Sequence, residues 1–200
     1  MSQRYKLSFT AASLALPQSL TIARVYLDTG DWAATRAKVL DENLLQLRSR
    51  SSSIRVYREL QRRLVGMSPQ ELTLLTESDD MDQKALLWHA FCTRYGLVRE
   101  WAQRVIIPRL QQMDLAISDS DVYAFLSRQA LEHPEIEDIK PSTREKLVTV
   151  LLRTMREAGI VSSDHMIIPM MLSLQVTEVL TSRGPDALGV FPLLQRPIGE

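Results

Sequence analysis

The sequence predicts a mainly α-helical protein. Apolar residues recur every three to four positions through most of the 200 residues, which is the spacing of one face of an α-helix. Helix-capping residues flank these runs, with Ser or Asp before them and Gly after them. Only one short segment, HMIIPMML at 165–172, favours a β-strand, and Pro169 limits that strand to the edge of a sheet.

Three helices are expected in the first third of the chain. They are predicted over residues 19–29, 32–47 and 51–65. Gly30 is placed to end the first helix, and Asp31 is placed to cap the second. The serines at 51–53 precede the third helix, which is amphipathic and closes at Gly66. We expect residues 8–66 to form a basic N-terminal unit that resembles a helix-turn-helix.

Helical patterns continue through the rest of the chain. They are predicted over residues 71–77, 83–106, 121–133, 144–158 and 173–182. Capping boxes are expected at Ser68–Glu71 and Ser142–Glu145, and a further N-terminal cap at Ser118–Asp121. Gly96 is expected to bend the long helix, and Pro108 to weaken or end it.

The chain beyond residue 66 divides near a linker bracketed by two prolines. Residues 67–135 are predicted to form a helical middle that packs on the N-terminal unit. Residues 136–200 are predicted to form a C-terminal helical unit and tail. Its long helix, the turn at Gly159 and the β-permissive segment are compatible with a winged helix that contains minor β structure. We expect all three parts to form one compact structure.

Charge is distributed unevenly, although the whole chain is neutral. Residues 1–66 carry 11 Lys and Arg against 5 Asp and Glu, a net charge of +6. Residues 67–135 have a net charge of −5, and residues 136–200 a net charge of −1. The basic third therefore suits an anionic partner, whereas the acidic middle is not expected to touch one.

Six arginines fall in one short stretch, with Glu59 as the only acid among them. They are Arg48, Arg50, Arg55, Arg58, Arg62 and Arg63. At about 100° per residue, Arg55, Arg58 and Arg62 share one arc of the predicted helix. The opposite arc carries Ile54, Tyr57, Leu60 and Leu64. One face can therefore be buried while the other presents a row of guanidinium groups.

This arginine stretch makes nucleic-acid contact the first hypothesis, because guanidinium matches phosphate oxygens and guanine edges. Arg48 and Arg50, in the turn before the helix, would contact phosphates, and the helical arginines would contact the backbone or a groove. Stacking on single strands is disfavoured, because Tyr57 is the only aromatic residue of the stretch and falls on the buried arc. The competing interpretation is a solvated face in which Glu59 pairs with neighbouring arginines.

A second basic set surrounds the start of the helix predicted at 144–158. Its candidate nucleic-acid contacts are Lys140, Arg144 and Lys146, with Arg153 and Arg156 further along. Glu145 and Glu157 are interleaved with these cations, so this set is the weaker candidate.

The sequence shows no motif for catalysis, metal binding or cofactor binding. It has no phosphate-cradling glycine loop, no histidines at ligand spacing and no catalytic triad. Cys92 is expected to be a buried thiol and His89 a core residue. No segment approaches the roughly 20 apolar residues that span a bilayer. We therefore expect a cytoplasmic, non-enzymatic protein with no metal, cofactor, small-molecule substrate or membrane contact.

Seven short blocks run in order along the first 160 residues. They are SFTAASL at 8–14, GDW at 30–32, ENLLQLRSRSS at 42–52, REL at 58–60, LLWHAFCTRY at 86–95, STREKL at 142–147 and MREAGI at 155–160. Together they resemble the BrxA family of bacterial BREX phage-defence loci. The resemblance implies a small non-enzymatic component of a system that methylates host DNA and blocks phage replication. It also implies DNA binding and a likeness to the RNA-binding antitermination factor NusB.

The expected function is duplex DNA binding within a phage-defence system, mainly through backbone phosphates. Contacts without base readout predict weak, sequence-tolerant and salt-sensitive binding, with a Kd of about 10⁻⁴–10⁻⁶ M at physiological salt. Two alternatives stay open. One is RNA binding in the manner of NusB. The other is a protein–protein adaptor that contacts other BREX proteins through the acidic middle or the Met-rich segment 165–172, and exposed methionines would favour it.

Overall fold

The computed structural model of the chain describes residues 4–194, and it is mainly α-helical, as predicted. The N-terminal third contains the 3-10 turn η1 (Ser8–Ala11), α1 (Leu16–Thr29), α2 (Trp32–Asp41) and α3 (Arg50–Leu64). The middle contains α4 (Pro69–Glu77), α5 (Asp80–Arg94), α6 (Gly96–Trp101), the π-helical η2 (Ala102–Ile106), α7 (Ile107–Gln111), α8 (Asp119–Ala130) and α9 (Pro134–Glu137). The C-terminal part contains α10 (Pro141–Glu157), α11 (Leu174–Thr181) and the 3-10 turn η3 (Pro185–Leu188).

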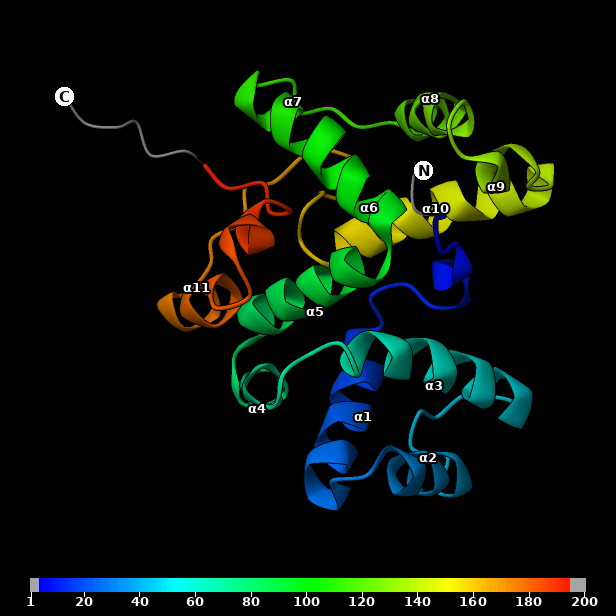
Figure 1. The fold of residues 1–200 in the computed structure, drawn as a ribbon, viewed down its shortest axis with the longest axis vertical. Helices are drawn as coiled ribbons and strands as arrows, with labels where there is room; N and C mark the ends of the chain where they lie inside the picture. The colour runs from blue at the N-terminus through cyan, green and yellow to red at the C-terminus, as the bar shows by residue number, and fades with distance from the viewer. Residues whose placement is uncertain (1–3, 195–200) are drawn as a thin grey trace.

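Helix α5 lies at the centre of the molecule, with α1 to α3 on one side and α6 to α10 on the other (Figure 1). Every residue from Ala85 to Cys92 is buried, which is typical of a helix enclosed on all sides. The fully buried side chains include Trp88, Trp101 and Tyr95. A single cluster of buried apolar residues draws on the N-terminal, middle and C-terminal parts of the chain.

Local capping chemistry sets most of the helix ends. Gly30 adopts a φ of 65° after α1, and the Asp31 carboxylate accepts the backbone N–H of Ala34 at 2.6 Å. Capping boxes form at Ser68–Glu71 and at Ser118–Asp121. These predictions are confirmed.

Two predicted features are wrong. Helix α2 ends at Asp41 rather than 47, because Asn43 and Gln46 adopt φ values of 48° and 52°, which no helix continues through. The box expected at Ser142 does not form, since α10 already begins at Pro141 after an uncapped Lys140. Pro108, which was expected to weaken or end the helix, does not end it and lies inside the helical run.

A π-helical turn explains how Pro108 is tolerated. The N–H of Ile107 bonds the carbonyl of Ala102, five residues earlier, so the hydrogen-bond ladder is already shifted where the proline interrupts it. The break in the long predicted helix instead falls at Tyr95, whose backbone is extended, one residue before Gly96.

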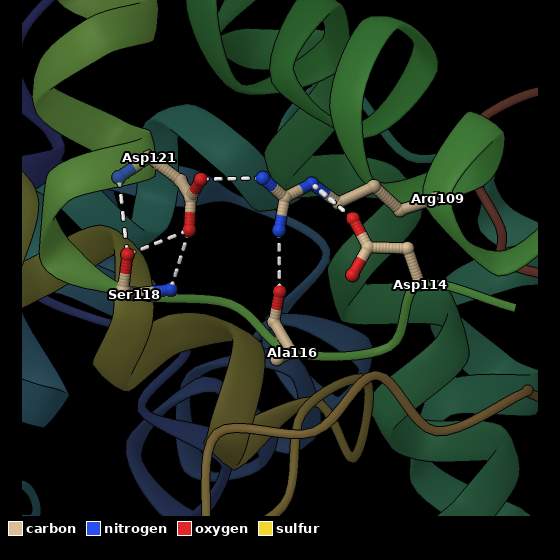
Figure 2. A network of polar contacts seen from close by, with 5 residues as sticks. All are labelled: Arg109, Asp114, Ala116, Ser118 and Asp121. Atoms are coloured by element: carbon tan, nitrogen blue, oxygen red, sulfur yellow. Dashed lines mark hydrogen bonds and ion pairs between the residues drawn. The ribbon is translucent and has the colours of Figure 1, made fainter. Parts of the chain in front are cut away.

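The loop between α7 and α8 is held by Arg109 (Figure 2). Its guanidinium donates to the carbonyl of Ala116 and to the Asp121 carboxylate, and its Nε lies 3.6 Å from Asp114. Asp121 in turn accepts the backbone N–H of Ser118 at 2.8 Å. One side chain thus fixes the start of α8 relative to the end of α7.

The C-terminal segment has isolated β-bridges where a short ribbon was expected. Within residues 4–194 they pair Val161 with Ile167, Ala116 with Met166 and Met170 with Leu193. At the N-terminal end, the two-residue turn after α1 and the longer connection 42–49 join three packed helices. The winged-helix and helix-turn-helix likenesses both stay predictions. No helix in the described part of the chain is long and apolar enough to cross a membrane.

Candidate nucleic-acid interface

Helix α3 has the two faces that its sequence predicts. The apolar arc is packed inward, and Tyr57, Leu60 and Leu64 are at most 1% exposed. The Tyr57 hydroxyl donates to the carbonyl of Trp32 in α2, 3.3 Å away, which ties this face to the neighbouring helix. The opposite arc is exposed and carries the arginines. Amphipathic spacing alone therefore positions the guanidinium groups on the surface.

Three of the exposed arginines have no acidic partner within residues 4–194. They are Arg48, Arg55 and Arg58. Two others are paired: Arg50 with Asp41 at 2.9 Å, and Arg62 with Glu59 at 3.6 Å. Arg50 is also the first residue of α3 rather than part of the preceding turn, because Ser49 caps the helix and accepts the N–H of Ser52.

Arg63 does not belong to this exposed surface, which corrects the sequence-based assignment. It is 4% exposed, and its guanidinium donates to the carbonyls of Ser13 and Ala12 and to the Tyr95 hydroxyl. The neighbouring Glu59 is also buried and accepts the hydroxyl of Tyr95. These groups hold the N-terminal segment onto α3 and α5, so Arg63 is a structural residue.

A further exposed arginine, Arg36, lies next to the buried arc of α3. Arg36 of α2 is exposed and lies close enough to Tyr57 to lower its pKa, although burial dominates and raises the pKa of Tyr57 to about 12. Arg36 falls in a helix with mixed charge, so no local excess of arginine points to it. Only the packing of α2 on α3 brings Arg36 close to Tyr57.

The second basic set lies at the N-terminal end of α10. Lys140 and Lys146 are exposed, whereas Arg144 is half-buried and donates to the carbonyl of Ile136 at 3.1 Å. The part of α10 that faces the α1 and α3 side carries Arg153 and Arg156, which line a groove of about 660 Å³ with Leu47 and Val56. At 1.5 Å per residue, that part lies about 10 Å further along the helix. The three predicted contacts are therefore not in the groove.

Fold and surface together define a small helical protein with an exposed arginine face on one amphipathic helix. The family model of BrxA matches residues 3–184, and the chain belongs to this family. A relative from Escherichia coli O9:H4 (strain HS), BREX protein BrxA, is 22% identical over 148 residues, which cover 74% of this chain and 70% of the relative. These two findings support a role in BREX phage defence.

The fold also matches a solved structure. The crystal structure of an uncharacterized protein from Magnetospirillum magneticum aligns with a TM-score of 0.80 at 20% sequence identity. The alignment covers 96% of this chain and all of the other. The helical arrangement described here is thus shared with that protein.

Proposed function

We propose that this chain is a non-enzymatic component of a BREX phage-defence system that binds duplex DNA through backbone phosphates. The observation that carries the proposal is the exposed arc of α3, where Arg48, Arg55 and Arg58 have no acidic partner among the described residues. Exposed guanidinium groups without internal partners remain available to phosphate oxygens, which they can contact bidentately.

Duplex binding is favoured over single-strand binding because the arginine stretch of α3, within the described residues, offers no exposed aromatic ring for stacking. Tyr57 is 1% exposed, so no base can stack on it. Phosphate contact without base readout makes the binding sequence-tolerant and strongly dependent on salt.

The experiment measures duplex DNA affinity across a salt series for the wild type and for Arg55/Arg58→Gln. Loss of two phosphate contacts is expected to reduce the slope of log K against log salt by roughly 2, since each contact contributes about 0.9. The matched control is Arg24/Arg128→Gln, which removes the same charge from exposed positions on α1 and α8. Equal slopes for the α3 variant and the wild type would remove α3 from the interface.

RNA is the first competing ligand. Duplex RNA has a deep, narrow major groove that side chains cannot read, so competition between duplex DNA and duplex RNA of one sequence separates the two. If the protein binds duplex RNA more tightly than duplex DNA, its ligand is RNA rather than DNA.

A protein–protein adaptor role is the second candidate, and the Met-rich segment favours it. Met166, Met171 and Leu174 are 40%, 76% and 72% exposed, which gives the segment an apolar outer edge. Met171/Leu174→Ser should weaken a complex with other BREX proteins while DNA affinity is kept. An unchanged complex would exclude this edge as the contact.

A further inference from the structure

A second basic feature lies where the ends of α3 and α5 meet the segment after α11. A hollow of about 250 Å³ opens there, and the residues that line it include no Asp or Glu. Its charged and ionisable lining residues are Lys6, Arg62, Arg63, Arg94, Arg183 and His89. They come from four separate stretches of the chain, so no sequence motif predicts the hollow.

Two carboxylates behind the hollow offset part of this charge. Glu71 is 1% exposed and accepts two donors from Arg183, one of them Nε at 2.6 Å. Glu59 lies 3.6 Å from Arg62 and beside the buried Arg63. Lys6 and Arg94 have no acidic partner in the described part of the chain. The Nε of Arg94 is buried and has no hydrogen-bond partner there.

Helix ends account for a further part of the charge. Helices α3 and α5 finish beside the hollow, and each C-terminus is equivalent to roughly −0.5 charge. Together with the two carboxylates they offset about three of the five cations. The remaining positive charge is what an anion would satisfy.

We propose that this hollow binds a phosphate group. Its volume suffices for phosphate with some ordered water, since each water occupies about 30 Å³. Lys6 at the rim and the guanidinium groups of Arg62 and Arg94 supply charge-assisted donors. Burial and the nearby Arg183 lower the pKa of His89, so a neutral imidazole in the wall can add one N–H.

The surroundings of the hollow favour an anion as well. Two adjoining hollows on either side of Thr93 add Arg4 and Arg99 to the basic surface, while each also holds one acid, Glu100 or Asp186. The phosphate can belong to the DNA backbone or to a free phosphorylated ligand. The hollow shares Arg62 with the exposed arc of α3 but not Arg55 or Arg58, and phosphate binding here does not depend on the function proposed for that arc.

The test titrates the protein with inorganic phosphate against sodium chloride of equal ionic strength, by calorimetry and by thermal unfolding. The wild type should bind phosphate saturably. Arg94→Met, which keeps the apolar stem, and the exposed Lys6→Gln should each weaken binding about tenfold, the loss expected for one charged hydrogen bond. Arg128→Gln, at an exposed arginine of α8 outside both proposed sites, is the matched control and should bind phosphate normally.

Two results would overturn the proposal. One is a wild type that responds to phosphate no more than to chloride. The other is Lys6→Gln and Arg94→Met binding phosphate as the wild type does. Lys6→Gln keeps the test decisive if Arg94→Met fails to fold, because Lys6 is on the surface.

Duplex DNA distinguishes the two sources of the phosphate. If the backbone supplies it, inorganic phosphate displaces DNA more than chloride does, and Lys6→Gln and Arg94→Met bind DNA more weakly. If a free ligand supplies it, both variants keep their DNA affinity, and a nucleoside monophosphate competes with inorganic phosphate. Each result supports the pocket. Failure of the α3 interface is seen separately, as unchanged DNA binding by Arg55/Arg58→Gln.

Discussion

The guanidinium of Arg63 donates through Nε to the Tyr95 hydroxyl at 3.2 Å and lies 4.4 Å above the ring of Phe91. The adjacent Arg62 is far less buried, with a side chain 46% exposed. One step along a helix rotates the side chain by about 100°, and that step separates a core cation from a surface cation. Two neighbouring arginines therefore have different roles.

The first prediction follows from this difference in burial. Arg63→Met should destabilise the fold by about 3 kcal/mol, because the carbonyls of Ala12 and Ser13 lose their buried charged donor and Glu59 loses a neighbouring buried cation. Arg58→Gln should change stability by no more than about 0.5 kcal/mol, since Arg58 is exposed and unpaired. Urea unfolding of both variants checks this. If the two variants have equal stability, Arg63 is not the structural cation described here. Adding Glu59→Gln to Arg63→Met should recover part of the loss.

The Arg109–Asp121 contact predicts a loss of stability in acid. Burial alone would raise the pKa of Asp121, but hydrogen bonds from Ser118 and the Arg109 guanidinium lower it. A carboxyl group whose pKa is lower in the folded state stabilises the fold at pH values above its pKa in the unfolded chain, about 3.9. This stabilisation is lost as the pH falls through the folded-state pKa. Asp121→Asn should therefore lower stability at pH 7 by about 1–2 kcal/mol and flatten the acid limb of the unfolding free energy. An unchanged acid limb would contradict the assignment.

Buried tyrosines predict a loss of stability at high pH. Burial raises the pKa of Tyr95 and of Tyr57 to about 12, and it raises the pKa of Tyr5 as well. The unfolded chain loses these protons near pH 10 while the folded protein keeps them, so the contribution of the tyrosines to stability is constant below pH 10 and falls above it. Absorbance at 295 nm should show these tyrosines ionising together with unfolding. Tyr57→Phe should move the onset to higher pH, and an unshifted onset would remove Tyr57 from the account.

How far the sequence predicts the fold depends on whether the deciding interaction is local. Gly30 and Ser68 act within a few residues, so the ends of their helices are read correctly from the sequence. The end of α2 at Asp41 depends instead on left-handed residues in a loop that buries Leu45, and periodicity continues past it.

The same distinction between local and non-local interactions decides which parts of the candidate sites the sequence predicts. The exposed arc of α3 follows from spacing alone, and it is found where the sequence places it. The hollow beside Arg94 joins residues from four separate stretches, one of them in the acidic middle segment. The net charge of a segment sums the charges on all faces of its helices. The negative net charge of residues 67–135 therefore gives no sign of the basic residues Arg94 and Arg99. The assignment of Arg63 to the exposed surface is wrong because the number of arginines in a stretch does not indicate which of them face the core.

Backbone conformation gives a last prediction, from two residues at the ends of α1 and α10. Ala15 precedes α1 with a φ of 53°, a left-handed conformation that disfavours a side chain by about 1–2 kcal/mol. Gly159 follows α10 with a φ of 75°, and a Cβ there would meet no atom within 4 Å. Ala15→Gly should therefore stabilise the protein by about 0.5–1 kcal/mol after the extra entropy of glycine in the unfolded chain. Gly159→Ala should destabilise it by about 1 kcal/mol through backbone strain alone. Thermal unfolding of the two variants should move the midpoint in opposite directions, and a shift of the same sign in both would show that strain does not decide these positions.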